Sequence, residues 1–135
     1  MTAPKPTSKL ITDFEDLLAW KEARQLHRLA CQACRDPQWK FRWGLKDQIR
    51  NAAVSVMANL AEGFERGWPK TLHQFVCFAK GSCGEVRSHI TAALEEGLVS
   101  AECASALRHQ CQRTEALIGG LRKSAAARAA AAKES

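Results

Sequence analysis

Two consecutive apolar stripes in the middle of the chain constrain its fold more than any other feature. Between residues 45 and 63, apolar or small side chains recur at spacings of three and four residues, which places them on one face of a helix. Gly67 and Pro69 then interrupt the pattern with a turn. The stripe resumes with the same spacing over residues 72–93. The sequence therefore predicts two successive helices, each with an apolar face to bury.

One polar residue, Asn59, falls on the first of these stripes. A buried amide without a hydrogen-bond partner costs about 1–3 kcal/mol, so a neighbouring helix must supply partners. We therefore predict an interhelical polar cluster made of Ser55, Asn59, Glu62, Lys80, Ser82 and Glu85. The alternative is that Asn59 lies at the edge of the stripe and contacts water.

A further helix is predicted before this pair. Thr12 and Glu15 have the spacing of a capping box, so the helix is expected to begin there. An apolar stripe over residues 19–33 follows, and the helix is expected to end near Arg35.

The boundaries of the next two helices are marked by cap and stop residues. Asp36 supplies an N-cap and Pro37 the first helical position, so the second helix is expected to run from Pro37 to about Arg66. The third helix is predicted over residues 69–96, with Gly97 just past its end.

Ser100 is expected to cap a fourth helix, whose stripe runs over residues 104–121. Four amphipathic helices with short connections predict an all-α, antiparallel up-down-up-down four-helix bundle over residues 12–123. Residues 1–11 are expected to form a disordered lead. Residues 124–135 are expected to form an Ala-rich basic tail that has no apolar face to bury and frays, the alternative being that it extends the fourth helix.

Length and composition limit the possible classes of protein. The 135 residues suit one domain, and no apolar run approaches the ~20 residues that a membrane-spanning helix needs. The polar N-terminus has no apolar segment typical of a signal peptide, so a cytoplasmic location is expected. The six cysteines are accordingly predicted to be free thiols.

One cysteine pair has a spacing that metal sites use. Cys31 and Cys34 form a CxxC motif and share a predicted helix face with His27. Strong zinc signals pair such a motif with a second close Cys or His pair, which this chain lacks. The favoured interpretation is that these are small packing residues, and we predict no metal and no other cofactor.

Positive charge is concentrated in the first half of the chain. The net charge is +6, and residues 21–50 hold eight basic residues against three acidic ones, a net of +5. Helical spacing arranges these residues as two exposed ridges, which predict a nucleic-acid-binding surface of Lys21, Arg24, Arg28, Arg42, Lys46 and Arg50. Trp39 and Trp43 lie nearby to stack on bases or on a partner. The alternative is a solvated face in which Arg50 pairs with Asp47 or another carboxylate.

Residues of the first three predicted helices carry a family resemblance: Phe14, Leu17, Trp20, Ala23, Leu26, Gln48, Arg50, Ser55, Val56, 59–63, 78–82 and Glu85. In them the chain resembles the four-helix bundle proteins also called 23S rRNA intervening-sequence proteins, over about residues 14–121. Met57 and Lys80 depart from the family pattern, which has proline and arginine there. A lysine ammonium cannot make the two parallel hydrogen bonds of an arginine guanidinium, so Lys80 cannot take over a bidentate role of that family arginine.

The resemblance implies a bundle encoded within inserts of bacterial rRNA genes. It also implies a relation to four-helix accessory proteins of diversity-generating retroelements, which are basic pentamers that bind nucleic acid and a reverse transcriptase. Self-association is further expected because a short four-helix core does not readily accommodate all four tryptophans: Trp20, Trp39, Trp43 and Trp68.

These observations predict a small cytosolic adaptor that binds nucleic acid, most simply RNA, through basic helix faces. The adaptor is expected to be a homo-oligomer, and the resemblance implies five subunits. No nucleophile with an orienting acid accompanies the four histidines, and no Gly-rich phosphate loop is present, so the prediction is a protein that is not an enzyme. The expected partners are a second copy of the chain, RNA, and a reverse transcriptase or other protein. The alternative is a protein–protein assembly module that binds no nucleic acid.

Overall fold

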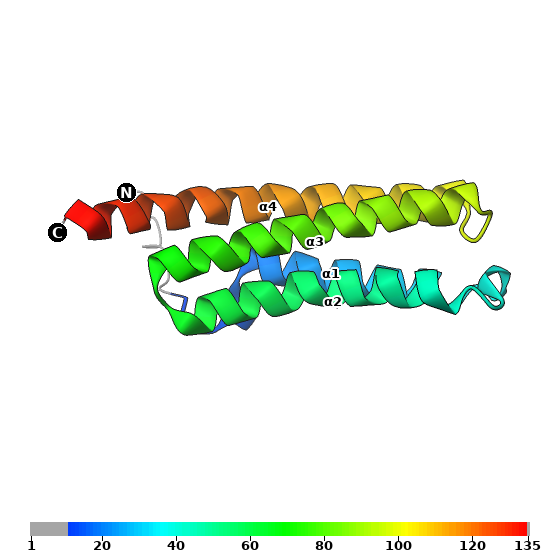
Figure 1. Cartoon of the computed structure of the whole chain (residues 1–135), viewed down its shortest axis with the longest axis horizontal. Helices are drawn as coiled ribbons and strands as arrows, with labels where there is room; N and C mark the ends of the chain where they lie inside the picture. The colour runs from blue at the N-terminus through cyan, green and yellow to red at the C-terminus, as the bar shows by residue number, and fades with distance from the viewer. Residues whose placement is uncertain (1–10, 135) are drawn as a thin grey trace, which may run out of the picture.

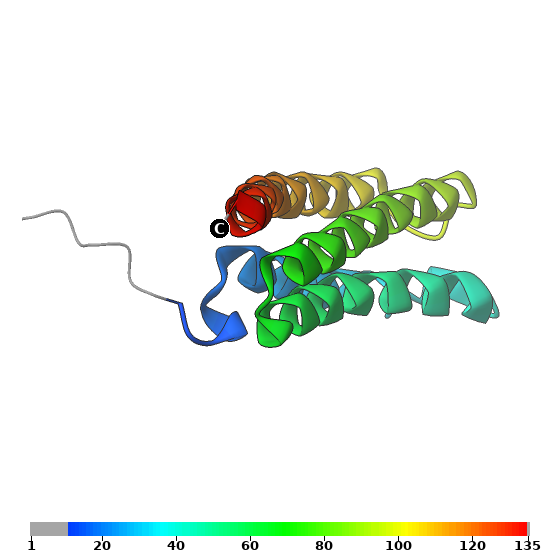
Figure 2. The same cartoon turned by 60° about the vertical axis from the view of Figure 1, so that its left-hand side comes forward.

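Four α-helices make up most of the computed structural model, which describes the backbone of residues 11–134. They are α1 (Leu18–Ala33), α2 (Trp43–Arg66), α3 (Pro69–Glu95) and α4 (Ala101–Glu134), and the short 3-10 helices η1 (Phe14–Asp16) and η2 (Pro37–Trp39) precede α1 and α2. α1 and α3 each pack against both α2 and α4. Successive helices run in opposite directions (Figures 1 and 2). The predicted all-α four-helix bundle is confirmed.

The start of the first helix differs from the prediction. Asp13, not Thr12, is the capping residue, and its Oδ1 accepts a hydrogen bond from the amide of Glu15 at 2.9 Å. That cap begins only the short helix η1, because Leu17 has an extended backbone and a buried side chain. α1 therefore begins at Leu18, and the predicted capping box is wrong.

The second helix also begins later than predicted. The Asp36 cap forms, but it opens only η2. Trp39 is buried, and its ring N–H donates to the carbonyl of Ala33 at 2.7 Å, which ties the connection to the end of α1. Lys40 then adopts a positive φ of 43°, which no helix contains, so α2 starts only at Trp43.

The other two connections agree with the sequence. Gly67 and Gly97, with φ of 77° and 72°, follow the ends of α2 and α3 in the left-handed conformation that favours glycine. The hydroxyl of Ser100 accepts a hydrogen bond from the amide of Cys103 at 3.0 Å, which confirms the cap of the fourth helix.

The core is formed by the predicted stripes, with Leu26, Val56, Val86 and Ile118 each fully enclosed. α4 continues to Glu134 and reaches past the α2–α3 turn (Figure 1). The alternative that the tail extends the fourth helix is therefore confirmed, and Ala125 is fully buried, so the tail does have an apolar residue to bury. The predicted disordered lead lies, except for Ile11, outside the described residues.

Candidate nucleic-acid interface

The exposed side of α1 carries uncompensated positive charge. Lys21, Arg24 and Arg28 are exposed, opposite the buried stripe of the same helix. The Arg24 guanidinium lies 6.0 Å from the centre of the Trp20 ring. None of these three residues forms an ion pair with another described residue, nor does Arg35 just after the helix. Four cations in and beside α1 are therefore available to an anionic partner.

The one acidic residue of α1 is directed away from these cations. Glu22 is partly buried against α4, where it accepts hydrogen bonds from Gln110 at 2.6 Å and from Arg113 at 3.0 Å. Its charge is thus neutralised by α4 instead of by the basic residues of its own helix. No sequence spacing indicates this, because Glu22 and its partners are about ninety residues apart.

Two of the residues predicted to bind nucleic acid from the second helix are ion-paired with carboxylates of the same chain. Arg42 forms two hydrogen bonds to the Glu96 carboxylate, at 2.8 and 3.1 Å. Through these bonds it holds the pKa of Glu96 below its usual range. Arg50 pairs with Asp47 at 2.7 Å, which confirms the alternative stated for this residue. Both pairs are exposed, so each is held only weakly.

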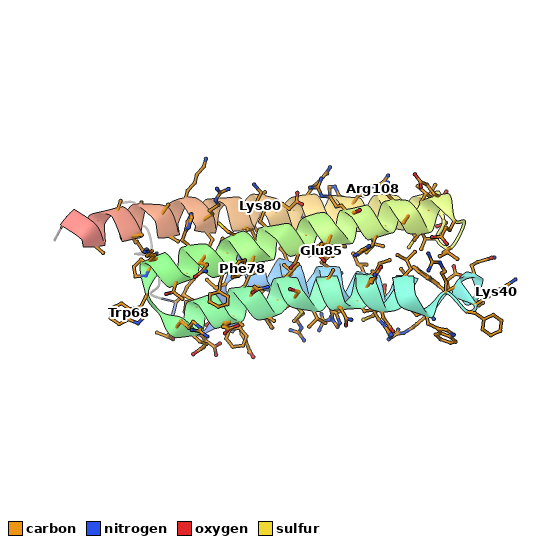
Figure 3. All side chains as sticks on the ribbon, in the orientation of Figure 1. Lys40, Trp68, Phe78, Lys80, Glu85 and Arg108 are labelled. Atoms are coloured by element: carbon orange, nitrogen blue, oxygen red, sulfur yellow. The ribbon has the colours of Figure 1, made fainter. Side chains whose placement is uncertain are left out.

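Lys46 differs from these two arginines. Its ammonium lies 4.7 Å from the ring centre of Trp43, a cation–π contact on an exposed ring. Trp39, which the sequence also suggested for stacking, is buried and unavailable. Phe41 is 85% exposed and was missed, although the alternation of basic and aromatic residues from Lys40 to Trp43 indicates it. Lys40 marks this end of the bundle in Figure 3.

The polar cluster around Asn59 is smaller than predicted. The hydroxyls of Ser55 and Ser82 lie 2.8 Å apart and join α2 to α3. The Asn59 amide donates to the carbonyl and the hydroxyl of Ser55, at 2.8 and 3.0 Å. The remaining predicted members lie outside this trio: Glu62 is exposed and pairs with Arg66, and Lys80 and Glu85 are exposed on α3 (Figure 3). Long charged side chains on these helices reach solvent instead of the interhelical space.

The two cysteines of the CxxC motif have different surroundings. Cys31 Sγ lies 3.3 Å from His27 Nε2, both half-buried on α1. Cys34 is enclosed, its thiol donates to the Lys46 carbonyl at 3.8 Å, and burial raises its pKa to about 11. Within residues 11–134, no three His, Cys, Asp or Glu side chains are grouped as metal ligands would be.

The four helices are also too polar to be membrane spans. In the described part of the chain, no helix has both the length and the hydropathy to cross a bilayer.

The described residues thus form a bundle of four helices in which α1 exposes a basic face, and comparison with known families specifies the protein further. The family model of the 23S rRNA-intervening sequence proteins matches residues 15–120. The chain belongs to that family. A comparison with curated proteins gives no match.

Proposed function

We propose that this protein is a non-enzymatic adaptor that binds RNA through the exposed face of α1. The observation that carries the proposal is the distribution of ion pairs. Five arginines of the described residues are ion-paired, and all lie outside α1: Arg42, Arg50, Arg66, Arg87 and Arg113. None of the three cations of α1 is ion-paired, so the exposed face of this helix presents only positive charge, whereas α4 carries the paired Arg113 beside its unpaired cations. The family name refers to an intervening sequence of 23S rRNA, which favours RNA as the anionic partner.

Binding by this face would depend on phosphate contacts. Lysine and arginine at helical spacing neutralise a phosphate backbone without reading the bases, so affinity should fall steeply with salt. Phe41 and Trp43 are both exposed, and Trp43 contacts Lys46, so they add rings on which unpaired bases can stack. The paired Arg42 and Arg50 contribute less than the sequence suggested, because each must leave a carboxylate first.

Self-association is the second part of the proposal. Trp68 is 74% exposed and Phe78 is 49% exposed, both in the half of the molecule nearer the α2–α3 turn (Figure 3). Such aromatic exposure supports a contact between subunits. The pentamer and the reverse transcriptase partner implied by the resemblance, and the cytoplasmic location expected from the N-terminal sequence, belong to the same proposal.

Two charge-reversal variants test the RNA proposal. Arg24→Glu with Arg28→Glu should abolish binding of a structured RNA without unfolding the bundle, because both residues face away from the core. Arg122→Glu with Lys123→Glu makes the same change in net charge on exposed residues of α4 and should retain most of the affinity. Fluorescence anisotropy at several salt concentrations measures both, and removal of each phosphate contact should flatten the salt slope by about 0.9.

The outcome separates the proposal from its alternative. Parental RNA affinity in the folded α1 variant would assign the protein to the protein–protein assembly class. Equal losses of affinity in both variants would show that binding depends on net charge and on no particular face.

A further inference from the structure

The His27–Cys31 pair has a geometry that the RNA proposal does not use. The two side chains are one helical turn apart on α1, and Cys31 Sγ lies 3.3 Å from His27 Nε2. A thiol in hydrogen-bond contact with an imidazole is the arrangement by which enzymes activate cysteine as a nucleophile. A surface cavity of about 250 Å³ opens at this pair, and its lining is completed by two guanidinium groups and an amide: Arg28, Arg35 and Gln32.

We propose that Cys31 is a modification site that exchanges with small disulfides bearing carboxylates, with His27 as the base and Arg28 and Arg35 as the anion-binding groups. Arg28 and Arg35 form no ion pair with other described residues, so both are available to a carboxylate. Glutathione disulfide is a reagent of this class. The proposal goes beyond RNA binding and does not depend on it.

The exchange needs no oxidant beyond the disulfide itself. His27 accepts the proton of the Cys31 thiol, and the thiolate attacks one sulfur of the disulfide. A new S–S bond forms at Cys31 while the reagent's S–S bond breaks. The departing thiolate takes the electron pair and then the proton from the His27 imidazolium, so the products are a mixed disulfide and one free thiol.

The position of Cys31 on α1 explains why the cysteine needs His27 as a base. Cys31 lies in the last turn of α1, where the free carbonyl groups carry partial negative charge, so the helix end itself does not attract an anionic reagent. The imidazole in contact with the thiol and the nearby guanidiniums are the groups that can act on the reagent at this position. Reactivity should therefore depend strongly on His27.

The other cysteines provide references within the same chain. Burial raises the pKa of Cys34 to about 11 and those of Cys83 and Cys111 to about 12, so these thiols are protonated at neutral pH and enclosed. Because Cys34 does not line the cavity, the expected product is the mixed disulfide and not a Cys31–Cys34 bridge. Cys77 is half-buried like Cys31 but lies on α3, which makes it the matched reference.

Modification would also change the proposed RNA interface, and this consequence rests on the proposed function. Cys31 lies on the same helix as Arg24 and Arg28, and a glutathione adduct adds two carboxylates beside them. RNA affinity should fall on modification and return on reduction. Protein without RNA is used for the modification test itself, so that a failure of RNA binding leaves that test unaffected.

The experiment measures modification of each cysteine in the full chain by peptide mass spectrometry. Glutathione disulfide is compared with cystamine, which carries ammonium groups in place of carboxylates, at pH 7 and equal ionic strength. We expect Cys31 to react at least about tenfold faster than Cys77. Glutathione disulfide should be the faster reagent at Cys31 only, and Arg28→Gln with Arg35→Gln should remove that preference.

The base is tested by His27→Gln, which should slow Cys31 about tenfold with both reagents. His109→Gln, an exposed histidine on α4, is the matched control and should leave the rate unchanged. Equal rates at Cys31 and Cys77, an unaltered rate in the folded His27→Gln protein, or a Cys31–Cys34 disulfide as the main product would each overturn the proposal. If His27→Gln does not fold, the reagent preference and its loss in the arginine variant still decide the outcome.

Discussion

At the scale of single residues, hydrogen-bonding capacity decides which polar side chains enter the bundle. Asn59 and Ser55 lie on α2, and through Ser55 they are joined to the buried Ser82 of α3. Two short hydroxyls and one amide fit between the helices, with hydrogen bonds of 2.8 to 3.0 Å among them. Lysine and glutamate at neighbouring positions stay in water, because burying their charges would need paired partners that the interhelical space does not hold.

Replacing Asn59 tests the strength of this trio. Asn59→Ala should lower the free energy of unfolding by about 1 kcal/mol and the melting temperature by about 2–5 °C, since Ser55 loses its amide partner. Thermal unfolding followed by circular dichroism measures the change. Glu85→Ala, on the exposed side of α3, should stay within about 0.5 kcal/mol of the parent. If Asn59→Ala melts with the parent while Ile49→Ala does not, Asn59 adds nothing to the core.

At the scale of helices, the approach of α2 to α3 depends on a small residue. The two ribbons lie closer together near their shared turn than at their other ends (Figures 1 and 2). Gly63 lies in this region, and a Cβ atom built on it would lie 2.8 Å from Cβ of Phe75. Since that atom is next to the backbone, it cannot move aside as the end of a long side chain could. The absence of a side chain at residue 63 therefore permits the close contact.

A pair of glycine substitutions tests this requirement. Gly63→Ala should destabilise the protein by about 1–3 kcal/mol, because overpacking outweighs the gain in helix propensity. Gly81 lies within α3, where an added Cβ atom would meet nothing within 4 Å, so Gly81→Ala should stabilise the protein by about 0.5–1 kcal/mol. Urea unfolding of both variants gives the two free energies. Opposite signs are expected, and stabilisation by both would contradict the packing argument.

At the scale of the whole molecule, the aromatic residues that the core does not accommodate bear on self-association. Trp39 is buried and Trp20 packs partly against the core, whereas Trp43 and Trp68 are exposed at opposite ends of α2. The expectation that one short bundle cannot bury four tryptophans is confirmed for the single chain. Repeating the α1 face in an oligomer would multiply weak phosphate contacts by avidity.

Sedimentation tests whether the chain self-associates and whether the exposed aromatics form the contact. The parent should sediment as an oligomer at micromolar concentration, and Trp68→Ser with Phe78→Ser should shift it towards the 14.9 kDa monomer, because apolar contact area is removed. Phe41→Ser with Trp43→Ser removes aromatics at the other end of the bundle and should leave the oligomer intact. A parent that sediments as a monomer would exclude self-association.

Much of this architecture follows from the sequence alone, because helix signals are local. Side chains three or four residues apart share a face whatever the rest of the chain does, so the stripes predict the four helices. Glycine and capping residues likewise mark ends correctly at Gly67, Gly97 and Ser100, where conformation depends on immediate neighbours. The basic face of α1 was predictable for the same reason.

Tertiary structure alone decided which charges remain available and where two helices begin. Glu22 is bound by α4, and Arg42 reaches Glu96 at the end of α3, so both outcomes depend on how whole helices are rotated and staggered against one another. Burial of Leu17 and Trp39 likewise ends the short helices that the caps at Asp13 and Asp36 open, so α1 and α2 begin later than the local signals predict. Helical periodicity specifies a face but not its partner, because side chains distant in sequence meet only after the bundle has packed.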